Sequence, residues 1–214
     1  MERTSVILKI IGIFAVFGFV HSLCVRDYIK RLVQDLLGET FMKAFYRLFY
    51  TLFSAATTLI AFGFIYALPD VPLLMSPVWL KVPMRLLQFS GLLLALMAFR
   101  VLDFLEFTGI KQAWRFTTGQ ELIGDREGLT LARLVTHGAY GIVRHPLYVA
   151  GLLIFTFDPD PARNRLVVSV LADIYFIYGA LSEEKRLISH FGSEYEEYMK
   201  KVPRFLPRFK KPVR

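Results

Sequence analysis

The polar residues that open one apolar stretch of the chain form an Arg-His-Pro-x-Tyr cluster, which runs from Arg144 to Tyr148. Tyr140 precedes this cluster, and a pair of carboxylates, Glu183 and Glu184, closes the next apolar stretch. A guanidinium donates two parallel hydrogen bonds to a carboxylate, carboxylates accept from ammonium and hydroxyl groups, and tyrosine rings attract cations. Ionisable groups beside membrane-grade apolar sequence are costly, and they usually mark a functional site. These residues therefore predict a site for a small charged ligand.

The elements that must position these groups are two apolar runs, residues 147–157 and 166–181. The segment between them, residues 158–165, is rich in Asp and Pro and is typical of a turn. Pro146 suits the first turn of a helix, where the free backbone N–H groups favour an anion. Because the ends of an antiparallel helical hairpin meet, we expect the Arg-His-Pro cluster and the two glutamates to form one pocket.

A ligand with a carboxylate, an ammonium, a ribose, an aromatic base and a cationic centre matches this set of groups. S-adenosylmethionine has all five. Two alternatives remain open at this point. Arg144 and the tyrosines also suit a basic, aromatic anchor at a membrane interface, and Glu183 can pair with Arg186 along one helix face.

Composition places the chain in a membrane. Of its 214 residues, 55% are hydrophobic, the mean hydropathy is +0.45, and there are 20 Phe and 10 Tyr. The net charge of +8 accompanies no nucleic-acid-binding motif, so we expect membrane lipid, and not nucleic acid, as the partner of the basic residues. The single cysteine and the spacing of the four histidines predict no disulfide framework and no metal site.

The apolar segments predict an all-α, polytopic membrane helix bundle that forms a single domain over residues 1–214. Three expected helices cover residues 5–24, 45–68 and 86–99, and the hairpin brings the total to about five crossings. An arrangement with four crossings and a re-entrant hairpin fits the same charges. We expect no obligate protein partner.

Basic residues gather in segments 25–44, 100–146 and 182–214, which the bundle places on one side. The excess of Lys and Arg predicts that the C-terminus and the active site face the cytoplasm. The last of these segments contains a capping-box pattern at Ser193-Glu-Tyr-Glu196, which predicts a short helix after Gly192. We expect the remainder to be a cytoplasmic amphipathic tail.

The cluster also resembles a known signature. Arg144-His145-Pro146-Leu147-Tyr148, followed by Glu183-Glu184, is similar to the C-terminal signature of integral-membrane methyltransferases, which include isoprenylcysteine carboxyl methyltransferases and phospholipid N-methyltransferases. The similarity covers residues 130–207 and leaves residues 1–107 as N-terminal transmembrane helices. Two departures concern the packing of the hairpin: Ala150 stands where the family has glycine, and the gap before the glutamates is longer than usual. Three N-terminal segments, at His21-Ser22, 46–50 and 109–112, resemble the methanethiol S-methyltransferase branch.

The resemblance implies an S-adenosylmethionine-dependent methyltransferase that acts on a thiol, carboxylate or amine of a small or lipid-like acceptor. It implies cofactor contacts from His137, Gly138, Tyr140, Arg144, His145, Tyr148, Glu183 and Glu184, with Tyr195 and Arg204 near the substrate. Arg144, His145 and Glu184 are the expected catalytic residues. A thiol or an amine must lose a proton, and His145 or Glu184 can take it if within hydrogen-bonding reach; the sequence does not require a dedicated base.

Two other classes of function compete with this hypothesis. Asp173 lies in the middle of an apolar segment, where an aspartate costs about 2.5–3.5 kcal/mol on insertion scales. It either pairs with a polar partner in the bundle or marks the pathway of a small membrane transporter or adaptor. Four histidines in a membrane protein also suit a haem-binding protein, although their spacing is not that of a metal site.

Overall fold

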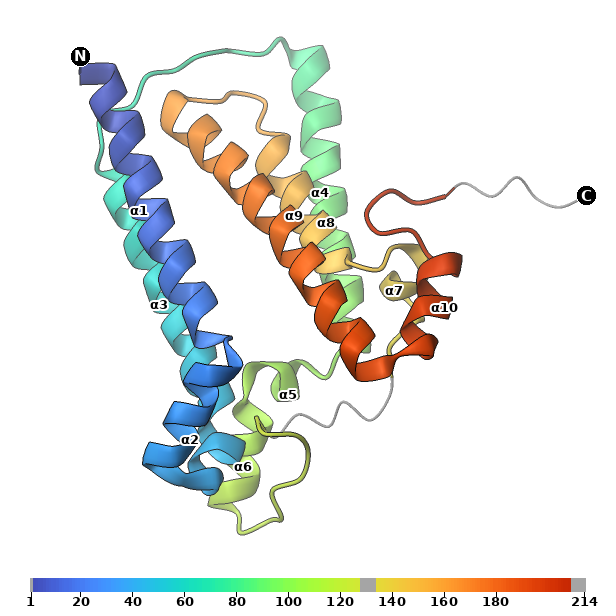
Figure 1. The fold of residues 1–214 in the computed structure, drawn as a ribbon. Coiled ribbons are helices and arrows are strands. Elements are labelled where there is room, and N and C mark those ends of the chain that lie inside the picture. Colours follow the sequence, from blue (N-terminus) through green and yellow to red (C-terminus); the bar gives the residue numbers. More distant parts are fainter. Residues whose placement is uncertain (1, 128–133, 209–214) are drawn as a thin grey trace, which may run out of the picture. The chain divides into compact units, whose positions relative to one another are not determined.

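The computed structural model describes residues 2–127 and 134–208 (Figure 1). These residues fold as helices joined by loops, which confirms the all-α prediction. The chain divides into two compact units: unit 1 comprises Met1–Pro69 and Asp103–Ala132, and unit 2 comprises Asp70–Leu102 and Arg133–Arg214. The expectation of one domain over the whole chain stays a prediction.

Unit 1 contains α1 (Glu2–Cys24), α2 (Asp27–Phe41), the π-helical segment η1 (Met42–Tyr46), α3 (Arg47–Tyr66), α5 (Phe104–Thr108) and α6 (Ile110–Thr117). The long helices α1 and α3 pack side by side (Figure 1). They confirm the helices expected at 5–24 and 45–68. The basic segment 25–44, which we expected to join these two helices, is itself largely helical, because most of it is α2.

A buried ion cluster joins α2, α3 and the segment after α6 within unit 1. The Lys30 ammonium lies 2.5 Å from one Glu127 oxygen, and the Arg47 guanidinium lies 3.5 Å from the other. Arg47 also donates to the Phe107 carbonyl at 2.7 Å. Gly109 is required beside this cluster, because it has a φ of 88° and a Cβ there would stand 2.2 Å from the Leu48 nitrogen.

Unit 2 contains α4 (Val78–Val101), α7 (Ala139–Ile142), α8 (Pro146–Thr156), α9 (Arg163–Phe191) and α10 (Ser193–Lys201). Helices α8 and α9 form the expected hairpin, and α4 packs along α8 (Figure 1). Small residues permit these close approaches. A Cβ on Gly91 of α4 would lie 3.0 Å from the Ala150 carbonyl, and a Cβ on Gly151 would lie 2.6 Å from the Phe176 ring.

Polar contacts also fix the turn of the hairpin. Asp160 accepts from the Ser76 backbone N–H at 3.0 Å and from the Lys81 ammonium at 2.8 Å. An isolated antiparallel bridge joins Pro72 to Ala162. The segment before α4 therefore holds the hairpin at the end opposite Arg144 and the glutamates.

Four helical segments are long and apolar enough to cross a membrane: Thr4–Cys24, Asp27–Tyr66, Val78–Val101 and Arg163–Phe191. With 11 residues, α8 is shorter than the about 20 that a full crossing requires. By length alone, α8 is therefore the short member of the hairpin that it forms with α9.

Three expected boundaries differ from those found. Helix α4 begins at Val78, eight residues earlier than expected, and it contains Pro83. It ends at Val101, two residues later than expected. Asp103 follows it and caps α5. The helix expected after Gly192 is α10, but Gly192 itself is its N-cap, with a φ of 56°, and Ser193 is the first helical residue.

Candidate active site

The chain reaches the N-terminus of α8 through a turn that requires glycine. Gly138 caps α7 with a φ of 61°, and a Cβ there would lie 2.6 Å from Val101 Cγ2 of α4. Helix α7 ends after one turn, and Arg144 and His145 follow in extended or irregular backbone before Pro146 starts α8. As the sequence predicts, Pro146 occupies the first turn of its helix, where its missing N–H costs no hydrogen bond.

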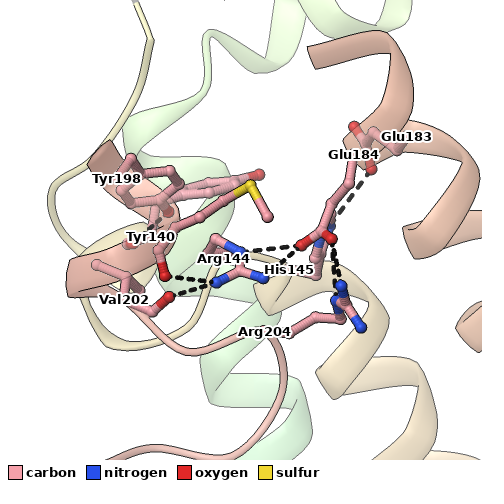
Figure 2. A network of polar contacts seen from close by, with 9 residues as sticks. Tyr140, Arg144, His145, Glu183, Glu184, Tyr198, Val202 and Arg204 are labelled. Carbon is pink, nitrogen blue, oxygen red and sulfur yellow. Dashed lines mark hydrogen bonds and ion pairs between the residues drawn. The ribbon is translucent and has the colours of Figure 1, made fainter. Parts of the chain in front are cut away.

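The side chain of Arg144 meets Glu184 of α9 in the interior of unit 2 (Figure 2). Arg144 Nε and Nη2 donate to Glu184 Oε1 at 2.9 and 2.7 Å. The two side chains are 7% and 5% exposed. Burial at this level requires that each charge be paired and hydrogen-bonded, and this pair ties the start of α8 to the C-terminal part of α9.

Arg144 also holds the segment that follows α10. Its Nη1 donates to the carbonyls of Met199 and Val202 at 3.1 and 2.6 Å, and its backbone N–H donates to the Pro203 carbonyl at 2.8 Å. The guanidinium therefore joins three segments: the start of α8, the end of α9 and the chain beyond α10 (Figure 2).

A second guanidinium approaches the same carboxylate from the outside. Arg204 Nε and Nη2 donate to Glu184 Oε2 at 3.0 and 2.6 Å. The hydrogen bond to Glu184 raises the pKa of Arg204. With an arginine on each oxygen, Glu184 is saturated, whereas the Arg204 side chain is 37% exposed and remains accessible to a ligand.

The imidazole of His145 lies between the two glutamates. Its Nε2 is 3.2 Å from Glu184 Oε1, and its Nδ1 is 3.5 Å from Glu183 Oε2. A neutral ring has a single N–H, so a neutral His145 can donate to only one of the two carboxylates at a time.

Four tyrosines surround this network. The Tyr148 ring lies edge-on to His145, with centroids 5.6 Å apart, and the Tyr198 hydroxyl donates to the Tyr140 carbonyl at 2.6 Å. Tyr195 is 1% exposed, and burial raises its pKa to about 12. Burial also raises the pKa values of Tyr140 and Tyr198. These phenols therefore stay neutral at physiological pH.

The outer side of the network carries the groups that a ligand can reach. The Glu183 side chain is 36% exposed, and His137 and Gly138 are exposed in the turn before α7. Glu183 and Arg204 therefore offer a ligand a carboxylate and a guanidinium. Arg144 and Glu184 lie behind them.

The structure brings most of the expected site residues together. Arg144, His145, Glu183, Glu184, Tyr148 and Arg204 adjoin one another, and Tyr195 lies under them within electrostatic range of Arg144 and Glu184. The roles assigned to them stay predictions. Sequence reasoning missed the carbonyls of Met199, Val202 and Pro203, since backbone acceptors carry no residue-type signal. It also gave Tyr198 no role at the site, although the Tyr-x-x-Tyr spacing in α10 could have indicated one.

Comparison with known proteins yields a consistent set of relatives. The chain is 27% identical over 203 residues to methanethiol S-methyltransferase 1 of Bradyrhizobium diazoefficiens, and the match covers 95% of this chain and 67% of that protein. It is 38% identical over 78 residues to the protein-S-isoprenylcysteine O-methyltransferase of Schizosaccharomyces pombe, covering 35% and 33%. It is 26% identical over 171 residues to Nurim of Xenopus laevis, covering 77% and 56%. No family model matches the chain, and no solved structure matches it.

By these matches the chain is similar to membrane methyltransferases, an isoprenylcysteine O-methyltransferase among them, and the matches support an enzyme that methylates a thiol or carboxyl acceptor. Four methanethiol S-methyltransferases match along 92% to 95% of the chain, whereas a fifth and the isoprenylcysteine enzyme match over about a third of it. The family resemblance read from residues 130–207 is thereby confirmed.

Proposed function

We propose that the chain binds S-adenosylmethionine at the ends of the α8–α9 hairpin and transfers its methyl group to a small thiol. The observation that carries this proposal is the convergence of Arg144, His145, both glutamates and Arg204 at one end of unit 2. Support for a thiol acceptor comes from the methanethiol S-methyltransferases that match nearly the whole chain.

The accessible groups fit the proposed cofactor. Glu183 suits an ammonium or the ribose hydroxyls, and the exposed side of Arg204 suits a carboxylate. The faces of Tyr148 and Tyr140 suit a sulfonium through cation–π attraction. Arg144 and Glu184 have their hydrogen bonds satisfied within the chain, so we assign them a positioning role: they fix Glu183, His145 and Arg204 around the ligand.

S-adenosylmethionine, when bound, supplies a methyl group on a sulfonium sulfur, which leaves as a thioether. The chain must align the acceptor with that methyl group and exclude water, and orientation is the largest contribution that it can make. Attack by the thiol sulfur forms a new carbon–sulfur bond and releases the thiol proton. Since the His145 side chain is 3% exposed and both of its ring nitrogens already face glutamates, we assign that proton to water and not to a dedicated base.

We further propose that the site faces the cytoplasm. The support is the excess of Lys and Arg in segments 25–44, 100–146 and 182–214. This side of the membrane also supplies S-adenosylmethionine in cells, so the charge pattern and the cofactor agree.

The proposal is tested by equilibrium binding and product analysis on the detergent-purified chain. We expect it to bind S-adenosylmethionine and to transfer labelled methyl to methanethiol faster than to a prenylcysteine or an amine lipid. Transfer to the prenylcysteine alone would retain the cofactor site and refute the thiol acceptor. A folded chain that binds no S-adenosylmethionine would refute the proposal as a whole.

A further inference from the structure

Helix α2 in unit 1 has its polar and apolar faces reversed relative to a helix on a water-soluble protein. Its inward face carries Lys30, which is 9% exposed and paired with Glu127. Its outward face carries Tyr28, Leu32 and Leu36, spaced four residues apart, which are 63%, 49% and 72% exposed. An apolar stripe normally packs against the core, so something other than water must cover this one.

The dimensions of the surrounding segment show why α2 is not part of a crossing. The continuous segment Asp27–Tyr66 has 40 residues, or about 60 Å of helix, while the hydrocarbon core of a bilayer is about 30 Å thick. Helix α3 alone, with its 20 residues, spans that thickness. The helical path breaks before it at Gly38, whose φ of 86° and ψ of 165° are not helical.

Polar side chains flank the stripe on one side only. Asp27, Arg31 and Asp35 are exposed and follow one another at the same four-residue spacing. Going around α2 from its inward face, one therefore meets a charged strip and then the apolar stripe. A helix with one charged and one apolar outward strip suits the boundary between lipid headgroups and acyl chains.

We propose that α2 lies in the plane of the membrane surface, with Tyr28, Leu32 and Leu36 in the lipid and Asp27, Arg31 and Asp35 toward water. The occupant of the stripe is the bilayer itself. Two observations favour lipid: α2 is continuous with the candidate spans α1 and α3 on either side, and Leu8, Leu52 and Leu59 of those spans are exposed apolar residues in the same unit. In addition, the tyrosine at the start of the stripe is a residue type that membrane interfaces favour.

The position of α2 can be read with nitroxide labels on the full-length chain in lipid vesicles. The chain has one cysteine, Cys24, so Cys24→Ser provides a parent for single labels at Leu32→Cys and Leu36→Cys on the stripe. Asp35→Cys and Arg31→Cys are matched controls on the charged strip of the same helix. We expect collisions with dissolved oxygen to exceed those with an aqueous nickel reagent several-fold at 32 and 36, and the order to reverse at 31 and 35.

Two results would overturn the proposal. Labels at 32 and 36 that collide with the nickel reagent as often as those at 31 and 35 would place the stripe in water. Labels at 32 and 36 that are shielded from both reagents and broadened by spin–spin coupling would show that a second copy of the chain covers it. If the Cys24→Ser parent does not fold, Leu32→Trp and Asp35→Trp in the unmodified chain are compared instead, and only the former should be quenched by lipids brominated in their acyl chains.

Discussion

Glu183 and Glu184 are adjacent in the sequence, yet the structure gives them different tasks. Glu184 accepts hydrogen bonds from Arg144 and Arg204 and is nearly sealed from solvent. Glu183 faces outward and has His145 beside it at 3.5 Å. Sequence reasoning treated the two as one carboxylate pair, because nothing in the order of the residues indicates which of them turns inward.

A matched pair of substitutions tests this division. We expect Glu184→Gln to lower the free energy of unfolding by about 3–5 kcal/mol, because it leaves buried guanidinium charge without its partner. We expect Glu183→Gln to lower the unfolding free energy by no more than about 1 kcal/mol, because the Glu183 side chain is partly exposed and its pairing with His145 is long at 3.5 Å. Thermal unfolding in detergent measures both changes.

For cofactor binding per folded molecule we expect the opposite order, with Glu183→Gln losing more affinity than Glu184→Gln. A charge-assisted hydrogen bond contributes about 1.5–3 kcal/mol, so Glu183→Gln should weaken S-adenosylmethionine binding by about tenfold to a hundredfold. Equal losses of stability in the two variants would contradict the assignment of Glu184 to the interior and of Glu183 to the ligand.

At the scale of the helices, the hairpin was largely predictable and α2 was not. The turn residues at 158–165 and the apolar runs on either side specified α8 and α9, because Asp and Pro end helices and long apolar runs have few other structures in lipid. The sequence at 25–44 mixes charged residues with leucines, and its polar inward face obscured the helical pattern. The early start of α4 was missed because Lys81, Pro83 and Arg85 interrupt its apolar sequence.

Asp173 links the two helices of the hairpin. Its Oδ2 accepts from the Thr156 hydroxyl at 2.7 Å, and its Oδ1 has no partner within the part of the chain that the structure describes. We expect Asp173→Asn, which keeps an acceptor for Thr156 and removes the charge, to fold at least as stably as the wild type. Asp173→Ala loses the hydrogen bond and should cost about 1–2 kcal/mol.

Retention of methyl transfer by the Asp173→Asn variant would agree with this purely structural role. Loss of activity in a well-folded Asp173→Asn variant would instead show that the charge itself is used, as the transporter alternative requires. Labelled-methyl transfer and thermal unfolding, measured on one preparation, separate these outcomes.

The opposite end of the hairpin should be sensitive to pH. The hydrogen bond from Lys81 holds the pKa of Asp160 below its usual value. A carboxyl group with a depressed pKa in the folded state stabilises that state above its unfolded pKa, and the stabilisation is lost as the pH falls through the folded pKa. We therefore expect the stability difference between the wild type and Asp160→Asn to be largest near neutral pH and to close in acid. A difference that does not change with pH would exclude this ion pair as its source.

For the molecule as a whole, composition was sufficient to predict a helical membrane protein, and the signature over residues 130–207 was sufficient to predict that its relatives are membrane methyltransferases. The arrangement inside the site was not predictable, because Arg144 donates two hydrogen bonds to the main-chain carbonyls of Met199 and Val202. These contacts depend on where α10 and the following segment lie, which residue types alone do not specify. The proposed function therefore depends on the contacts between the start of α8 and the C-terminal part of α9.

The measurement that tests this account most directly is the binding of S-adenosylmethionine to the purified full-length chain, wild type beside Glu183→Gln, with folding verified for both. The account predicts saturable binding to the wild type and binding weaker by about tenfold or more in the variant. Equal affinity in the two proteins, or no binding to a folded wild type, would contradict it.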